Sequence, residues 1–345
     1  GIMAGTSKKG PARQPQPRIV EPAVIEEPRL YRAGLQAELQ KFGRRNNDLQ
    51  RWLPFMDIQP EAKMTEASGL DLTERQAKAL HAIQQLLDKT DYQGNRPGEE
   101  VQSQAFQWSG SIPRLAVSYT DYFEAFGLSR GAGGSYSRHQ IQEALEALHS
   151  LTEPRLICYR RTKWKGKERR YDVIRTKAPV IKILEGWKDL TEEERQEVEA
   201  GGDVPGKRAR GFIIEASPLL VDGIQTFYTL KPASLHREIQ QLHQGKRYPR
   251  AESLCIEYLL TKNTKTVRVS LDVLAERLRL DKYIRQRKRA RVEAIIRDCL
   301  ETARQLRYLL DIREEPGDLF VLTLNPERCK RIGTKDQGSG QEEAE

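Results

Sequence analysis

The chain has 345 residues, enough for two domains of ordinary size with tails, and its Lys and Arg residues outnumber Asp and Glu by 58 to 49. No stretch approaches the about 20 apolar residues of a membrane span, and the first residues lack the apolar core of a signal peptide, which together predict a soluble cytoplasmic protein. The four cysteines lie far apart without Cys-x-x-Cys spacing, so we expect neither a zinc site nor a disulfide framework.

Residues 1–69 divide into two parts by composition. Residues 1–29 carry five prolines among small and charged residues and have almost no apolar periodicity, which predicts a disordered tail. Residues 30–69 form an N-terminal extension that turns amphipathic, with Trp52 and Phe55 among its apolar residues. We expect one or two helices here, packed on the first domain, and the sequence assigns them no role.

Residues 70–232 carry three helix signals followed by a hairpin. A capping box or a capping serine precedes each helix, and a short strand at 115–117 precedes the second one. The capping residues are Thr73 with Gln76, Ser118, and Ser137 with Gln140. Two strands at 155–162 and 168–175 join at a Lys-Gly-Lys turn. Three helices followed by a hairpin are the order of a winged-helix domain.

Two polar, glycine-bearing segments near 88–111 and 188–210 are interpreted as insertions in this first domain. The second one holds a predicted helix, capped by Thr191 and Glu194. The segment 211–230 then returns to strand-like residues, which would complete the sheet of the first domain.

Residues 233–330 repeat the same order of elements. Apolar residues at 254–260 and 271–278 mark a first helix and a short second helix, and a long third helix is predicted at about 284–309. A hairpin through 311–324 turns at a Glu-Pro-Gly-Asp sequence. We therefore expect an α+β, mainly helical fold with two tandem winged-helix domains. The predicted divisions are 1–29, 30–69, 70–232, 233–330 and 331–345, the last a disordered acidic tail.

The start of this third helix is the strongest candidate for contact with DNA. Val292, Ile296 and Cys299 lie at helical spacing and define a buried face, so arginines and two alanines point outward. Guanidinium groups contact guanine edges or phosphates, and small residues let a helix sit deep in the major groove. The predicted base contacts are Arg287, Arg291 and Arg297, and the predicted phosphate contacts are Lys282, Arg285, Lys288 and Arg289. The alternative is a solvated basic helix face.

The hairpin at 155–175 is the second candidate, because basic residues surround Trp164 and the glycine tip. Such a basic wing lies along the DNA backbone or reaches into a minor groove. Its expected contacts are Arg161, Lys163, Lys165, Lys167, Arg169 and Arg170. The alternative is an edge hairpin whose lysines discourage strand-to-strand aggregation.

The third helix of the first domain is a weaker candidate for contact with DNA. Glu143 and Glu146 fall on its outward side, where two carboxylates would repel phosphates. Only the first turn is expected to contact DNA, through Ser137, Arg138, His139 and Gln140. The outer face of the helix stays open to a protein partner, including a second copy of this chain.

Signatures of enzymes are mostly missing from the sequence. It contains no Gly-x-x-x-x-Gly-Lys-Ser/Thr loop, and no His-hydrophobic-His triplet accompanies a tyrosine as in a metal-dependent nickase. The five histidines are scattered, and the acidic residues show no paired arrangement, although a nuclease cluster assembled by folding stays open. We therefore predict a protein that is not an enzyme and has no cofactor or metal.

The segment Val269–Leu278, running into Tyr283 and the basic helix, resembles the iteron-binding replication initiators of theta-replicating plasmids. The resemblance spans roughly residues 70–327 and rests on the order of elements. It implies two winged-helix domains: the C-terminal one reads most of the repeat, and the N-terminal one contacts DNA in the monomer and forms the dimer interface. It places Arg287, Arg291 and Arg297 on the recognition helix, the residues around Arg313 on its wing, and Ser137–Gln140 and Lys163–Arg170 in the first domain's contacts.

The resemblance implies a non-catalytic mechanism. Several monomers would bind repeats in the double-stranded DNA of an origin, help to open it and recruit a host helicase or initiator protein, while a dimer would repress the protein's own gene. One alternative is a dimeric winged-helix transcription regulator, and another is an enzyme of DNA transfer or cleavage. The two insertions depart from the compact family pattern, which leaves the dimer interface open.

Overall fold

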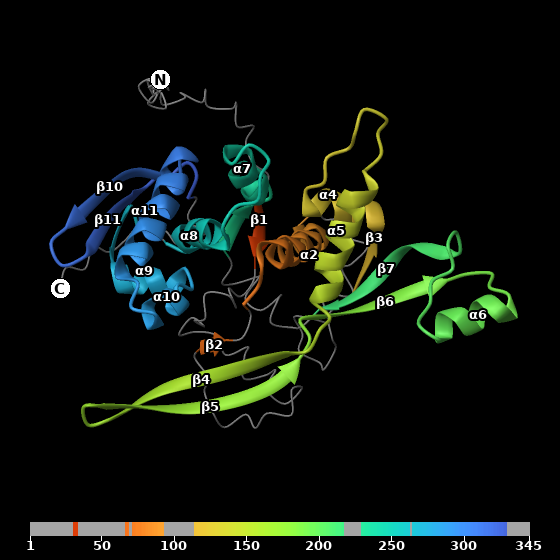
Figure 1. Ribbon diagram of the computed structural model, residues 1–345, viewed down its shortest axis with the longest axis horizontal. Coiled ribbons are helices and arrows are strands. Elements are labelled where there is room, and N and C mark those ends of the chain that lie inside the picture. Colours follow the sequence, from red (N-terminus) through yellow and green to blue (C-terminus); the bar gives the residue numbers. More distant parts are fainter. Residues whose placement is uncertain are drawn as a thin grey trace, which may run out of the picture.

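The computed structural model describes the chain in six segments, which are residues 30–33, 66–68, 71–92, 114–216, 229–262 and 264–329. Helices and small antiparallel sheets alternate along these residues, so the fold is α+β (Figure 1). Within these segments, no helix combines the length and the hydropathy needed to cross a bilayer. The two predicted tails and most of the predicted N-terminal extension lie outside the described residues.

Three helices and a sheet enclose a first hydrophobic core. The helices are α2 (Glu74–Tyr92), α4 (Tyr119–Phe126) and α5 (Arg138–Ser150). Tyr122 is fully buried among them, and its hydroxyl donates a hydrogen bond of 2.7 Å to the carbonyl of Ala144. The bond offsets the cost of removing this hydroxyl from water. Helix α2 runs through residues 88–92, which were expected to begin an insertion.

Side-chain caps start these helices where the sequence predicts them. Ser137 and Gln140 form a reciprocal box, in which each side chain accepts the backbone N–H of the other at 3.2 Å. The same box precedes α2 and α6 (Glu192–Glu199), and Ser118 caps α4. Helix α4 ends at Gly127, whose φ of 92° is the left-handed conformation that glycine adopts without strain. These predicted helix starts are confirmed.

Two antiparallel sheets of three strands accompany the first core. In one sheet, β7 (Arg208–Ala216) lies between β3 (Arg114–Ser118) and β6 (Ile181–Trp187). The other sheet is composed of β2 (Glu66–Ser68), β4 (Arg155–Lys165) and β5 (Glu168–Ala178). In Figure 1 the β4–β5 hairpin projects from the base of α5 and runs out beneath α9 and α10.

This pairing differs from the compact first domain expected from the sequence, because β3 pairs with β7 and not with the β4–β5 hairpin. Phe212 and Ile214 of β7 are buried while Ile213 is exposed, so β7 presents an apolar face to the core. Among the hairpin side chains that the structure describes, Ile157 alone is buried to a similar degree. Residues 188–207 of the predicted insertion form the connection between β6 and β7, with α6 inside it, and residues 208–210 begin β7.

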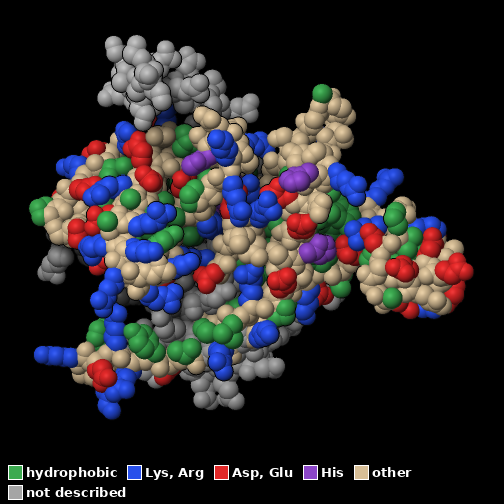
Figure 2. Space-filling model, viewed as in Figure 1, with side chains coloured by type: hydrophobic (Ala, Val, Ile, Leu, Met, Phe, Trp, Pro, Cys, Tyr) green, Lys and Arg blue, Asp and Glu red, His purple; other side chains and the backbone are tan. Residues whose placement is uncertain are grey.

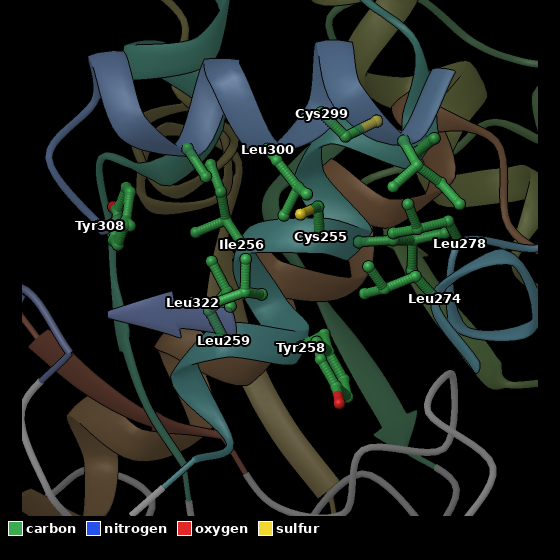
Figure 3. Close-up of a cluster of buried hydrophobic side chains, with 14 of the residues drawn as sticks. Cys255, Ile256, Tyr258, Leu259, Leu274, Leu278, Cys299, Leu300, Tyr308 and Leu322 are labelled. Atoms are coloured by element: carbon green, nitrogen blue, oxygen red, sulfur yellow. The ribbon is translucent and has the colours of Figure 1, made fainter. Parts of the chain in front are cut away.

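A second hydrophobic core lies in the C-terminal half (Figure 3). Leu259, Leu274 and Leu300 meet there from three helices, and Leu322 joins them from a strand. The helices are α7 (Leu235–Leu242), α8 (Arg250–Leu260), α9 (Leu271–Arg277), α10 (Asp281–Arg285) and α11 (Arg289–Gln305). The sheet is β9 (Thr266–Ser270), β10 (Leu309–Glu315) and β11 (Leu319–Leu324), in the order β10-β11-β9.

The long third helix predicted at 284–309 is wrong in its extent, because the chain forms α10, a break and then α11. Arg287 has a φ of 53°, and the N–H of Lys288 donates to the carbonyl of Tyr283 at 3.0 Å. This is a Schellman motif that ends α10. Glycine usually occupies the left-handed position of this motif. An arginine there gives no signal in the sequence that the helix stops.

Several further elements were not predicted, among them β2 and β6. Helix α7 and strand β9 belong to the C-terminal half, and β9 supplies the third strand of its sheet. Leu30–Ala33 is strand β1, where the sequence predicts a helix, and it pairs with β8 (Thr229–Pro232). Tyr31 of β1 is buried. This pairing joins segments about 200 residues apart in the chain, which local periodicity does not reveal.

A cluster of five ionisable side chains, four of them buried and the fifth, Arg250, 13% exposed, connects the two halves, and we call it the buried ion cluster. Its members are His81 of α2, Lys231 of β8, His236 of α7, and Arg250 and Glu257 of α8. The Glu257 carboxylate accepts from Arg250 Nη1 at 2.8 Å and from Lys231 Nζ at 3.2 Å. His236 Nε2 lies 2.8 Å from His81 Nδ1, and His81 Nε2 lies 3.5 Å from Glu257 Oε1. The cluster thus links α2 of the first core to the helices of the second.

The cluster fixes the charge states of its members. Burial, together with the nearby Lys231 cation, lowers the pKa of His81, and burial lowers the pKa of His236 well below its usual value. Burial alone would raise the pKa of Glu257, but Arg250 and Lys231 hold it well below its usual range. Both imidazoles are therefore neutral in the folded protein at pH 7, and the carboxylate is charged.

Stability is expected to fall as the pH drops below about 6.5, because both histidines take up protons more readily in the unfolded chain than in the folded one. Each contributes up to about 1.4 kcal/mol per pH unit between its unfolded and folded pKa values. Urea midpoints measured from pH 7.5 to 5.0 check this, with His81→Gln as the comparison. The variant should show a shallower loss of stability, and equal slopes would contradict the assignment.

Candidate nucleic-acid interface

Basic side chains gather on α10, on the break after it and on the first turn of α11. Lys282, Arg285, Arg287, Lys288 and Arg291 are all exposed, and we call them the α10–α11 basic surface. In Figure 2, Lys and Arg side chains are prominent over these helices and along the β4–β5 hairpin. These five residues form no ion pair with a carboxylate among the described residues, so their charges face the solvent.

Small and apolar side chains lie within this surface. Ala290 and Ala294 of α11 are exposed, as predicted for a helix that approaches DNA closely. Ile284 of α10 is 45% exposed and was not singled out from the sequence. The sequence does show Ile284 as an apolar residue inside a basic run. In the continuous helix predicted from the sequence, however, its side chain would have pointed in a different direction.

Arg291 lies across Tyr283, with its guanidinium carbon 5.7 Å from the centre of the ring. A cation–π contact of this kind orients an arginine while leaving its N–H groups free to donate. The ring of Tyr283 thus orients the Arg291 side chain, and the guanidinium N–H groups stay available to donate hydrogen bonds. Among the predicted base contacts, it has the environment that best fits that role.

Two other arginines of α11, Arg289 and Arg297, are engaged by carboxylates of the β10–β11 hairpin. Arg297 donates twice to Glu314, through Nε at 2.9 Å and through Nη2 at 3.2 Å. Arg289 pairs with Asp318 at the hairpin turn. These pairs hold α11 against the hairpin and partly neutralise both arginines. Arg313 of β10 is largely exposed, with the carboxylate of Asp311 at 3.5 Å.

The β4–β5 hairpin has the predicted basic tip. Its strands pair from Arg155 opposite Ala178 to Lys165 opposite Glu168, and a two-residue turn of Gly166 and Lys167 joins them. Lys165, Lys167, Arg169 and Arg170 are all exposed there, and Arg170 donates to Glu168 at 2.8 Å. Arg161 and Lys163 lie on β4, with their backbones opposite Asp172 and Arg170. Their side chains lie outside what the structure describes.

Residues 137–140 lie apart from this hairpin. They form the first turn of α5, while the other end of α5 leads into β4. A helix of 13 residues separates the two places by about 20 Å. Ser137 and Gln140 use their side chains to cap the helix, which leaves Arg138 and His139 exposed. The structure therefore collects the predicted residues into three places, not one continuous surface.

His81, His236 and Glu257 form one group whose geometry resembles a metal site. Their ligand atoms lie within 4.8 Å of one another, and all three side chains are buried. However, the Lys231 ammonium lies 3.5 Å from His81 Nε2 and 3.2 Å from Glu257 Oε2, and Arg250 pairs with the same carboxylate. A metal cation would have to displace these cations. The group therefore fits an ion cluster better than a metal centre.

Comparison with known proteins gives the family. The chain is 33% identical over 342 residues to virulence plasmid protein pGP2-D of Chlamydia muridarum, a match that covers 89% of this chain and 95% of that protein. The chain belongs to the pGP2-D family. Two further members are pGP2-D of Chlamydia trachomatis, 32% identical over 343 residues, and pGP2-D of Chlamydia psittaci, 31% identical over 343 residues. These matches cover at least 94% of each relative.

The match to the pGP2-D proteins extends over both halves of the fold. It therefore includes the α10–α11 basic surface, the hairpin and the buried ion cluster, as parts of one chain of nearly the same length. No family model matches the chain. A crystal structure of domains 2 and 3 of RctB is similar at a TM-score of 0.36 and 12% identity, over 76% of this chain and 87% of that one.

Proposed function

We propose that this pGP2-D family member is a non-enzymatic protein of plasmid replication that binds double-stranded DNA at repeated sites. The observation that carries the proposal is the α10–α11 basic surface, whose five cations have no carboxylate partner among the described residues. Unpaired guanidinium and ammonium groups around two exposed alanines suit a helix that enters a major groove. The printed names of the relatives, virulence plasmid proteins, support the plasmid setting.

The fold of the C-terminal half supports the same proposal. The order α8, β9, α9, α11, β10 and β11, with the sheet order β10-β11-β9, fits a winged-helix domain. In that assignment α11 is the recognition helix and β10–β11 is the wing, so Arg313 would face the DNA backbone. The first half is assigned as a modified domain of the same kind, in which β7 replaces the hairpin beside β3.

The two halves would then bind one site together. The buried ion cluster ties α2 to α7 and α8, so the hairpin of one half and the recognition helix of the other keep a fixed spacing. A monomer that uses both surfaces would cover about two turns of DNA without symmetry. Opening of the origin, self-association to a dimer and recruitment of a host helicase or initiator are further parts of the proposal.

Selection of bound fragments from random double-stranded DNA, followed by footprinting of the selected site, tests this function. A long asymmetric site bound by one chain is the expected result. A palindrome bound by two chains would replace the proposal with a dimeric transcription regulator. If no sequence is enriched, the basic surface is only an electrostatic patch, and the proposal is wrong.

Removing the two lysines of the hairpin tip should weaken binding to all DNA sequences alike. In Lys165→Ala with Lys167→Ala, each lost phosphate contact should reduce the slope of log K against log salt by about 0.9. Titrations between 50 and 200 mM salt measure this slope. Lys182→Ala with Lys188→Ala is the matched control, because these exposed lysines lie on and just after β6. The assignment fails if both double variants change the slope equally.

A further inference from the structure

The β4–β5 hairpin has two faces of different chemistry. Side chains alternate between the faces along each strand, and residues directly opposite each other share a face. Trp164 is opposite Arg169, Tyr171 is two positions further from the tip, and Leu156 is opposite Lys177. These residues, together with Val173 and Arg175, lie on one face, which we call the Trp164 face.

The Trp164 face is apolar yet exposed to solvent. Trp164, Val173, Leu156 and Tyr171 are 63%, 56%, 53% and 50% exposed. Single exposed apolar side chains are common, but the solvent side of an antiparallel sheet is normally polar. Four large ones on one side of a single hairpin indicate a binding surface. Ile157, on the other face, is buried instead.

Among the described side chains of β4 and β5, those that carry charge on the Trp164 face are all basic. Arg169, Arg175 and Lys177 are exposed between its apolar side chains. The two carboxylates of β5, Glu168 and Asp172, belong to the opposite face by the same register. Arg169 lies over the ring of Trp164, with its guanidinium carbon 5.2 Å from the ring centre. The face therefore suits a partner that carries negative charge and flat apolar groups together.

A nucleic-acid strand with unpaired bases has this combination. In a duplex the base faces are stacked inside, so two exposed rings would find nothing to stack on, while a single strand offers a base face at every nucleotide. Trp164 and Tyr171 are two residues apart along the ladder, about 7 Å, and so present two separate platforms. Arg169 lies opposite Trp164, and Arg175 and Lys177 follow Tyr171 by four and six residues along β5, so the same face offers cations to the phosphates of such a strand.

We propose that the Trp164 face binds single-stranded nucleic acid, with bases stacked on Trp164 and Tyr171 and phosphates held by the cations of the same face. This site is separate from the α10–α11 basic surface. It does not require that the protein recognise a duplex sequence. A chain that binds duplex DNA with one surface and an unpaired strand with another would bind both the remaining duplex and the released strand where DNA opens locally.

Fluorescence anisotropy of the full chain tests the site, with a labelled 20-nucleotide oligothymidine and a labelled 20-base-pair duplex as probes. Trp164→Ala with Tyr171→Ala should weaken the single-strand complex at least about tenfold, since each lost stack contributes substantially to affinity. Binding of the duplex should change less than about twofold. Trp164→Phe with Tyr171→Phe should retain most single-strand affinity, because phenylalanine rings also stack.

Two controls separate this proposal from the proposed duplex function. Lys282→Ala with Arg285→Ala should weaken the duplex complex and leave the oligothymidine complex nearly unchanged. Thermal unfolding of the alanine pair should stay close to that of the wild type, because each ring is at least half exposed and its removal breaks only surface contacts such as that of Arg169 with Trp164. Equal losses on both probes, or no binding of oligothymidine by the wild type, would overturn the proposal. Loss of self-association in the Trp164→Ala, Tyr171→Ala variant would also overturn the proposal, because the Trp164 face would then be a contact between two copies of the chain.

Discussion

Glu257→Ala is expected to lower the free energy of unfolding by about 3–5 kcal/mol, the largest effect of any single substitution considered. Glu257 is 1% exposed and is the only carboxylate of the buried ion cluster. Its removal takes the counter-charge from the ammonium of Lys231, which is 4% exposed, and one carboxylate partner from Arg250. An uncompensated buried charge costs far more than a broken contact at the surface.

Equilibrium unfolding in urea measures this loss, and Glu301→Ala provides the matched control. Glu301 pairs with Arg304 at 2.8 Å on the exposed side of α11, so its removal should cost less than about 1 kcal/mol. A cost for Glu257→Ala no greater than that of Glu301→Ala would mean that the cluster does not hold the halves together.

The cluster also explains what sequence reasoning missed. Its five members come from α2, β8, α7 and α8, and about 175 residues separate His81 from Glu257 in the chain. Each histidine alone looks like an ordinary surface or core residue. Only the folded arrangement brings their nitrogens within 2.8 Å of each other. Long-range polar contacts of this kind leave no periodic signal, whereas the helices that carry them do.

Local signals predicted local structure well. The capping boxes at Thr73, Ser137 and Thr191 start helices as expected, because the same side chains satisfy the first free N–H groups wherever a helix begins. The break at Arg287 escaped prediction for the opposite reason. The hydrogen bonds of a Schellman motif involve only backbone atoms, so they can form at an arginine as well as at a glycine, at a cost in backbone strain.

Parts of the candidate site were also predictable. Composition and helical spacing predicted which basic residues face the solvent, and the five residues of the α10–α11 basic surface are all exposed. The pairing of Arg289 with Asp318 and of Arg297 with Glu314 was not predicted, because the hairpin carboxylates lie 17 to 29 residues further along the chain. The break at Arg287 also places Lys282 and Arg285 on a short helix of their own.

These contacts distinguish Arg291 from Arg297, two arginines of one helix that the sequence alone treats as equivalent. Arg291 is held by a ring and keeps its N–H groups available, while Arg297 spends two of its donors on Glu314. A free guanidinium can form the bidentate contact to guanine that discriminates between bases. A guanidinium that is already paired must first separate from its carboxylate partner. For Arg297 that partner is Glu314, which would then face the phosphates of the DNA.

Arg291→Ala should therefore cost about 1–3 kcal/mol on the selected DNA site and much less on random DNA. Arg297→Ala is the matched control on the same helix. It should have a smaller effect on both DNAs and lower stability by no more than about 1 kcal/mol, because it removes an exposed ion pair. Equilibrium titrations on both DNAs at one salt concentration measure the difference. Equal losses on specific and random DNA for Arg291→Ala would show that Arg291 contacts phosphate and not a base. A loss of affinity for Arg297→Ala as large as that for Arg291→Ala would show that DNA displaces Glu314 from Arg297.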